Sequence, residues 1–156
     1  MTGPTSRARA RREPRLLAAA LWLVAAWGCG SEAPADQNIA VEGVRDGRFA
    51  VDVTADGGRP EGQLRVSVEP RPGWHLALEA PARLELASSE RLRFEPEQQT
   101  HEDAARVGED GLAFEFAYAD AADGELPVEA RIKFGMCKDE AEQCEIVRRD
   151  LSFHLP

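Results

Sequence analysis

The stretch that decides the fold is LAFEFAY at residues 112–118, where large apolar side chains occupy every second position. Successive side chains of a strand point to opposite faces, so this pattern predicts a strand with one face in a core and the other in water. VEARIKF at residues 128–134 alternates in the same way. The shorter runs with this period are 49–53, 64–68, 84–86, 92–94 and 151–155.

Turn-forming residues separate these runs, as in DGG at 56–58, PRPG at 70–73, GEDG at 108–111 and DG at 123–124. Short strands at this spacing predict an all-β fold, an immunoglobulin-like antiparallel β-sandwich of seven to eight strands. The polar stretch 97–106 is expected to form either a helical turn or a long loop. The residues predicted for the core are Val51, Val66, Val68, Phe114, Phe116, Ile132, Phe134 and Phe153.

The N-terminus has the pattern of an export signal. Five arginines between residues 7 and 15 precede an unbroken apolar run, Leu16–Trp27, of 12 residues. A membrane-spanning helix needs about 20 residues, so the run is expected to belong to a cleaved signal peptide. The following Gly28 and Cys29 complete the series A-W-G-C, which resembles the lipobox of bacterial lipoproteins. That resemblance implies cleavage before Cys29 and attachment of lipid to its sulfur.

These features divide the chain into a lipoprotein signal peptide at 1–28, a flexible tether at 29–38 and a β-sandwich domain at 39–156. The expected location is the periplasmic face of a bacterial membrane, with the outer membrane favoured and the lipid as the membrane contact. Trp27 departs from the lipobox, which usually has a small residue there. Cleavage by an ordinary signal peptidase near residues 33–35 is therefore the alternative.

Charge and cysteine content narrow the function further. The leader holds five arginines and one glutamate, so its removal changes the net charge from −9 to −13. A domain this acidic repels nucleic acid, and no nucleic-acid partner is expected. Of the three cysteines, lipidation of Cys29 leaves Cys137 and Cys144 as a pair. Export to an oxidising compartment favours a disulfide between them.

The cysteine pair has two interpretations. The segment FGMCKDEAEQC at 134–144 lies between two predicted strands, so a disulfide there would join the limbs of a β-hairpin. As a plain staple, a ring of this size contributes about 2.5 kcal/mol on the chain-entropy model. A redox-active pair needs exposure and a depressed thiol pKa. The acidic residues of this segment (Asp139, Glu140, Glu142 and Glu145) act against a thiolate, which favours the staple.

Three motifs resemble the N-terminal periplasmic domain of the thiol–disulfide interchange protein DsbD: GWHL at 73–76, HED at 101–103 and the late cysteine pair. The resemblance covers residues 43–156 and implies an immunoglobulin-like domain that exchanges disulfides through Cys137 and Cys144. The implied partners are a membrane thiol transporter or a thioredoxin-like protein. The chain departs from the family by one extra residue between the cysteines. Ala104 and Ala105 also stand where the family carries an aromatic lid.

The competing hypothesis is a non-enzymatic binding or structural lipoprotein module whose disulfide is only a staple. His75, His101 and His154 lack the spacing of metal ligands, so no metal site is predicted. The sequence also lacks a phosphate-binding glycine loop and a G-x-S-x-G motif, and no cofactor is predicted.

Overall fold

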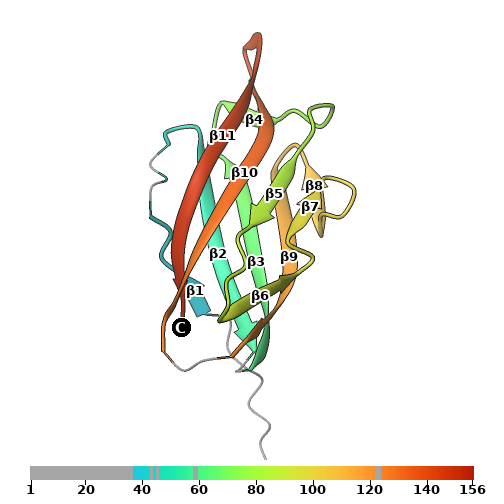
Figure 1. Ribbon diagram of the computed structural model, residues 1–156. Helices are drawn as coiled ribbons and strands as arrows, with labels where there is room; N and C mark the ends of the chain where they lie inside the picture. The colour runs from blue at the N-terminus through green and yellow to red at the C-terminus, as the bar shows by residue number, and fades with distance from the viewer. Residues whose placement is uncertain (1–36, 43, 45, 58–59, 122–123) are drawn as a thin grey trace, which may run out of the picture. The chain divides into compact units, whose positions relative to one another are not determined.

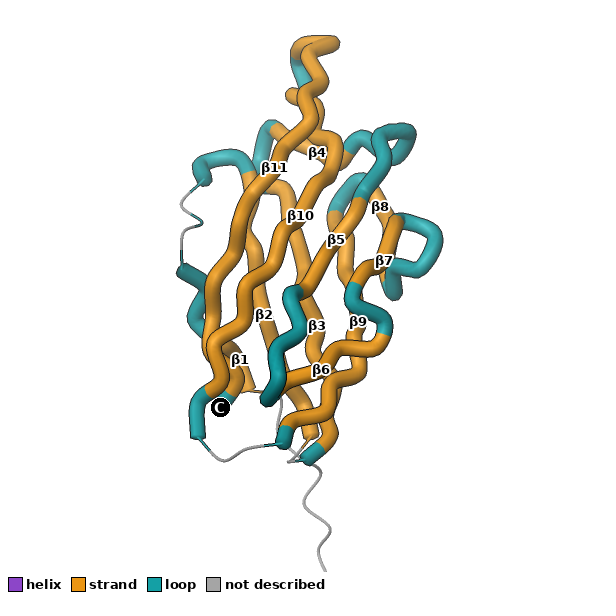
Figure 2. The backbone as a smooth tube through the Cα atoms, viewed as in Figure 1, coloured by secondary structure: helices purple, strands orange, loops and turns teal. Residues whose placement is uncertain are grey.

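The computed structural model describes residues 37–42, 44, 46–57, 60–121 and 124–156. The expected signal peptide and Cys29 lie outside the described residues. The described part contains strands and loops but no helix, as Figures 1 and 2 show. The strands are β1 (Gln37–Ile39), β2 (Phe49–Gly57), β3 (Glu61–Pro70), β4 (Trp74–Leu76), β5 (Arg83–Leu86), β6 (Leu92–Glu95), β7 (Gln98–Thr100), β8 (Arg106–Gly108), β9 (Gly111–Asp120), β10 (Leu126–Lys138) and β11 (Ala141–Leu155).

The strands form two antiparallel sheets, which confirms the predicted sandwich. The six-stranded sheet has the order β1-β2-β3-β9-β6, with β8 also paired to β9. The five-stranded sheet has the order β11-β10-β5-β7, with β4 also paired to β10. Each sheet therefore buries one face and leaves the other to solvent, which is the arrangement that period-two alternation requires.

The number of strands was underestimated. The sequence predicted seven to eight, whereas the described residues form 11. The additional strands are short: β1, β4, β7 and β8 have three residues each, too few to show alternation. β7 and the start of β8 lie in the stretch 97–106 that was expected to be a helical turn or a loop, and β1 includes the last two residues of the expected tether.

The core lies between the two sheets, and all but one of the eight residues predicted for it are buried. Val66, Val68, Phe114, Phe116, Ile132, Phe134 and Phe153 are each at most 1 % exposed. Val51 is the exception: it packs against the core but is only half-buried and lines an open surface depression beside Val44. The rings of Phe49 on β2 and Phe134 on β10 meet edge to face at 5.1 Å, which joins the two sheets.

The β10–β11 hairpin extends past the other strands at one end of the sandwich (Figure 1). Since Phe49 packs against Phe134, the start of β2 lies at this same end. β1 pairs with residues 53–55 of β2 and therefore lies toward the other end. In the described part of the chain, no helix has the length and apolar character needed to cross a membrane.

Candidate functional site at the disulfide hairpin

The two cysteines face each other across the hairpin. β10 and β11 pair continuously from Leu126↔Leu155 to Cys137↔Cys144, and the register then shifts between Cys137 and Lys138. Cys137 and Cys144 form a disulfide, as predicted, with an S–S distance of 2.03 Å and a Cα–Cα distance of 4.1 Å. The bond therefore closes the hairpin just before its turn.

The disulfide lies on the outer face of the five-stranded sheet. Phe134 and Met136 point into the core, so alternation places Cys137 on the opposite face. Cys137 is nevertheless only 7 % exposed, while Cys144 on the edge strand β11 is exposed. A thiolate arriving from solvent therefore has access to the Cys144 side of the bond.

The segment Ala77–Ala80 covers the outer face of β10 at Gly135, two residues before Cys137. The Ala77 N–H donates a hydrogen bond to the Gly135 carbonyl at 3.1 Å. A Cβ atom on Gly135 would lie 2.2 Å from the Cβ of Ala80, so only glycine permits this approach. Ala104, where the resemblance placed an aromatic lid, is instead partly buried against the core.

A histidine and an aspartate flank the disulfide. β4 places His75 directly opposite Cys137, so the row His75–Cys137–Cys144 crosses three adjacent strands. Side chains opposite each other in a pair of strands have Cβ atoms about 5 Å apart. The Nδ1 atom of His75 lies 2.8 Å from Oδ1 of Asp139 in the hairpin turn. The carboxylate thus orients the imidazole beside the disulfide.

The tryptophan before this histidine anchors a cation. Trp74 lies opposite Lys138 in the ladder, and the guanidinium of Arg48 lies 5.7 Å from the centre of its ring. Arg48 also forms an ion pair with Glu145, the residue after Cys144. Two acidic residues of the hairpin, Asp139 and Glu145, are therefore engaged by His75 and Arg48 respectively.

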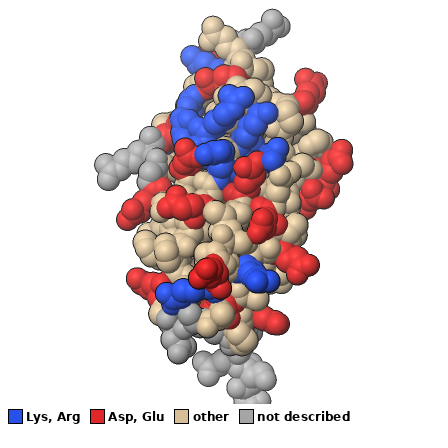
Figure 3. Space-filling view, in the orientation of Figure 1, with Lys and Arg blue, Asp and Glu red and all other residues tan. Residues whose placement is uncertain are grey.

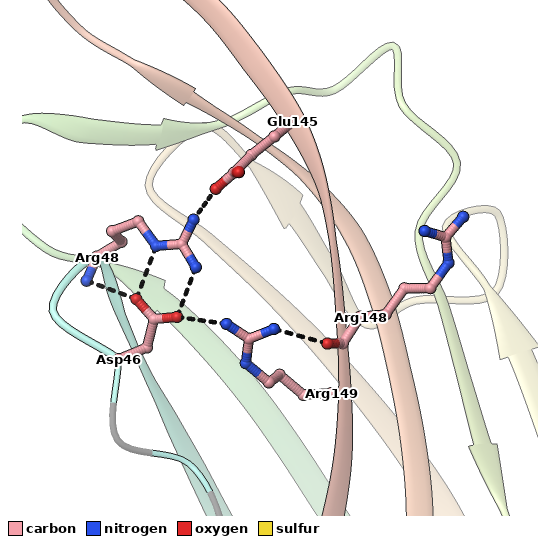
Figure 4. Close-up of polar contacts among 5 residues, drawn as sticks. All are labelled: Asp46, Arg48, Glu145, Arg148 and Arg149. Atoms are coloured by element: carbon pink, nitrogen blue, oxygen red, sulfur yellow. Dashed lines mark hydrogen bonds and ion pairs between the residues drawn. The ribbon is translucent and has the colours of Figure 1, made fainter.

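Arg48 is held in place by Asp46 (Figure 4). Asp46 accepts hydrogen bonds from Nε and Nη2 of Arg48 at 2.8 and 2.6 Å and from Nη2 of Arg149 at 2.7 Å. The side chain of Asp46 is only 8 % exposed. The hydrogen bond from Arg48 is the main reason that the pKa of Asp46 falls far below its ordinary value of 3.8. Asp46 therefore remains ionised and fixes Arg48 beside the hairpin.

Sequence reasoning missed these neighbours of the cysteines. It placed His75 in the GWHL motif and predicted no metal site for it, and it counted Asp139 and Glu145 as free negative charges. No signal in the sequence identifies these neighbours. His75 and Cys137 pair although they are 62 residues apart, and alternation within a strand does not say which strands pair. The resemblance did place GWHL and the cysteine pair in one domain, and the structure brings them together.

The other two histidines lie elsewhere. His101 follows β7, and His154 lies opposite Pro127 at the far end of the β10–β11 ladder. Within the described residues, no group of three histidine, cysteine, aspartate or glutamate side chains is placed to hold a metal ion. In the HED motif, Asp103 accepts hydrogen bonds from the N–H and hydroxyl of Thr100, which lowers its pKa and closes the turn after β7.

No protein-family model matches the sequence, and no curated protein matches it either.

Proposed function

We propose that this protein takes part in thiol–disulfide exchange through Cys137 and Cys144. The observation that carries the proposal is the row His75–Cys137–Cys144, in which one exposed cysteine, one buried cysteine and an oriented imidazole are neighbours. The resemblance to the DsbD N-terminal domain supports the same activity through the same two cysteines.

The reaction follows from the difference in exposure. A thiolate of a reduced partner protein attacks Sγ of Cys144, the Cys137–Cys144 bond breaks, and a mixed disulfide forms with Cys144. Cys137 leaves as a thiolate and takes a proton, for which His75, directly opposite it in the β4–β10 ladder, is the proposed donor. A second thiolate of the partner then releases Cys144, so the partner is oxidised and the pair is reduced by two electrons. The reduced pair transfers these electrons to an oxidised exported protein by the reverse steps.

The acidic surroundings of the pair oppose this reaction less than their sequence implies. Negative charge near a thiol raises its pKa and disfavours the thiolate. In the structure, Asp139 is engaged by His75, and Glu145 is engaged by Arg48. Arg48 also brings a positive charge to the residue next to Cys144.

The reduction potential of the disulfide tests the proposal. We expect the purified protein to equilibrate with a glutathione or dithiothreitol buffer at a potential above about −300 mV, the region of exchange-active disulfides. With oxidised glutathione, Cys137→Ser should form a mixed disulfide through Cys144 and release one reduced glutathione, whereas Cys144→Ser should form much less because Cys137 is buried. A potential well below about −300 mV, or no reduction without denaturant, would exclude exchange.

A binding or structural module is the second candidate function. The burial of Cys137 and the unbroken ladder up to the disulfide favour it, since both are features of a stabilising cross-link. On this reading, Cys137→Ser with Cys144→Ser should lose about 2–4 kcal/mol of unfolding free energy and keep any binding activity. On the exchange reading, the same double variant folds but cannot transfer electrons.

We also propose that the chain is exported and anchored at the periplasmic face through lipid on Cys29. The arginines, the apolar run and the A-W-G-C series support this proposal. The mass of detergent-extracted protein should match a chain that begins at Cys29 and carries more than one acyl chain, because a single chain gives only marginal membrane binding. Cys29→Ser should release the protein from the membrane fraction, and a soluble wild-type product that begins after Cys29 would refute the anchor.

A further inference from the structure

Three cations lie side by side on adjacent strands, on the outer face of the five-stranded sheet. Lys133 on β10 pairs with Arg83 on β5 and with Arg148 on β11. Like charges at opposite positions destabilise a sheet. Fourteen of the lysines and arginines follow residue 28 in this acidic chain, so three in one row are not a consequence of a basic composition. The row, called the cationic row below, therefore requires a reason other than folding.

The neighbouring row on the same face has the opposite design. Arg131, two residues before Lys133, pairs with Glu85 on β5 and Asp150 on β11. Its Nε donates a hydrogen bond to Asp150 at 2.9 Å. The charges in this row alternate in sign and stabilise one another. The sheet can thus accommodate complementary charges, and the cationic row departs from that pattern.

The cationic row lines a groove of about 430 Å³. Figure 3 shows lysine and arginine gathered over β5, β10 and β11, on a molecule whose visible edges are mostly acidic or neutral. Pro81, Ala82 and Thr100 contribute uncharged surface to the groove, and His101 and Arg131 add further basic groups. The two acidic residues of the groove are Glu85, which pairs with Arg83, and Glu102.

Two cations of the row are available to a ligand. Among the ion pairs formed within the described part of the chain, none includes the side chain of Lys133 or Arg148. Figure 4 shows the Arg148 guanidinium directed away from the network of Asp46, Arg48 and Arg149, although Arg148 and Arg149 are adjacent in sequence. Arg148 is exposed and Lys133 is half-buried.

We propose that this groove binds an acidic polypeptide segment of a partner protein. Adjacent strands are about 4.8 Å apart, so the row spans roughly 10 Å from the backbone of Arg83, which is already paired with Glu85, to that of Arg148. Cations spread over that span match several carboxylates along a chain better than one compact anion. The uncharged residues of the groove provide contacts for aliphatic side chains between the carboxylates. A flat bilayer surface fits less well, because Lys133 and Arg148 line a groove.

The groove is separate from the disulfide and its binding does not depend on exchange. Lys133 lies four residues before Cys137 on β10, which corresponds to about 13 Å along the strand. The two sites share the outer face of the sheet, and the segment Ala77–Ala80 lies over Gly135 between them. A partner held in the groove would therefore be close to the hairpin without contacting the sulfur atoms.

The test measures binding of a fluorescein-labelled peptide of alternating glutamate and alanine by fluorescence anisotropy at low and high salt. The groove variant is Lys133→Gln with Arg148→Gln. The control variant is Arg65→Gln with Arg93→Gln, which removes the same charge from exposed positions of the other sheet. We expect the groove variant to bind about tenfold more weakly than wild type, which is 1.4 kcal/mol, and the control to bind like wild type. High salt should weaken binding by the wild type.

Three results would overturn the proposal. The first is equal binding by the wild type and the groove variant. The second is an equal loss in both double variants, which would indicate attraction to net charge alone. The third is preferential binding of vesicles containing phosphatidylglycerol, or complete competition by equimolar inorganic phosphate, which would assign the groove to a lipid or a small anion. Thermal unfolding of each variant checks that loss of binding is not loss of fold.

Discussion

The two faces of β10 are built by different rules. Toward the core, Val128, Ala130, Ile132, Phe134 and Met136 are all buried. On the opposite face, the same strand carries Arg131 and Lys133, followed by Gly135 and Cys137, which are covered. The inner face is a continuous apolar row that any stable sandwich needs. The outer face includes a like-charged pairing, a glycine within a strand and a cysteine, none of which the sandwich requires.

On β10, the residues that stabilise the core and the residues of the candidate functional sites therefore lie on opposite faces of the strand. Apolar burial explains every residue of the inner face. Stability does not explain two features of the outer face, the like charges that stand opposite each other and the glycine that weakens the strand. We therefore assign the candidate functions of the protein, disulfide exchange and binding of an acidic segment, to the outer face.

The largest effect is expected from the inner face. Phe134→Ala removes a ring that is 1 % exposed and contacts Phe49 of the other sheet. It should lower the free energy of unfolding by about 3–5 kcal/mol in urea denaturation. Glu129→Ala, on the exposed face of the same strand, should change it by less than about 0.5 kcal/mol. Similar losses for both variants would mean that the two faces do not differ as described.

The sequence was sufficient to predict the inner face and the fold class. Alternation identifies the buried residues of 128–134 and, apart from Ala113, those of 112–118, because burial on one face has period two whatever the strand pairs with. It also identified the disulfide, since the two cysteines are only seven residues apart.

The surroundings of the cysteines could not be predicted, because they depend on which strands pair. His75 reaches Cys137 only through the β4–β10 ladder. Arg48 reaches Glu145 from the loop before β2. The cationic row likewise consists of residues that are ordinary exposed side chains in each separate strand. Their alignment follows from the register across β5, β10 and β11.

The second-largest loss of stability is expected from replacing Asp46, which holds Arg48 in place. Asp46→Asn should destabilise the protein by about 1.5–3 kcal/mol at neutral pH, since Asp46 accepts charged hydrogen bonds from Arg48 and Arg149. The pKa of Asp46 is lower in the folded protein than in the unfolded chain. Its contribution is therefore complete above the ordinary value of 3.8 and is lost as the pH falls toward the depressed folded pKa.

Urea unfolding over a series of pH values measures this contribution. The difference between wild type and Asp46→Asn should be constant from neutral pH to about pH 5 and should shrink at lower pH. A difference that stays constant down to the most acidic pH would contradict the role of the ionised carboxylate.

The third-largest loss of stability is expected from replacing Gly135, two residues before Cys137. Gly135→Ala would place a Cβ 2.2 Å from the Cβ of Ala80, so the segment Ala77–Ala80 must move away from β10. Because that segment can shift outward, we expect a loss on the order of 1 kcal/mol, the lower end of the range for overpacking. Hydrogen exchange at the Ala77 amide, which bonds to the Gly135 carbonyl, should become faster.

Gly47→Ala is the matched control, since a Cβ at Gly47 meets no atom within 4 Å. It should leave both the stability and the Ala77 exchange rate close to wild type. Equal behaviour of the two variants would show that the close contact over β10 is unimportant.

The smallest effect has the opposite sign and is the sharpest test of the outer face. Lys133→Gln removes the middle charge of the cationic row, where Arg83 and Arg148 repel it. It should raise the free energy of unfolding by about 0.2–1 kcal/mol, although it removes a long side chain from a half-buried position. Arg131→Gln makes the same change in charge two residues away on the same face, but between Glu85 and Asp150, and should destabilise. Both differences should decrease at high salt, because screening weakens repulsion and attraction alike. Destabilisation by Lys133→Gln, as expected for Arg131→Gln, would show that the cationic row does not oppose folding. The repulsion within the row would then be no argument for a ligand.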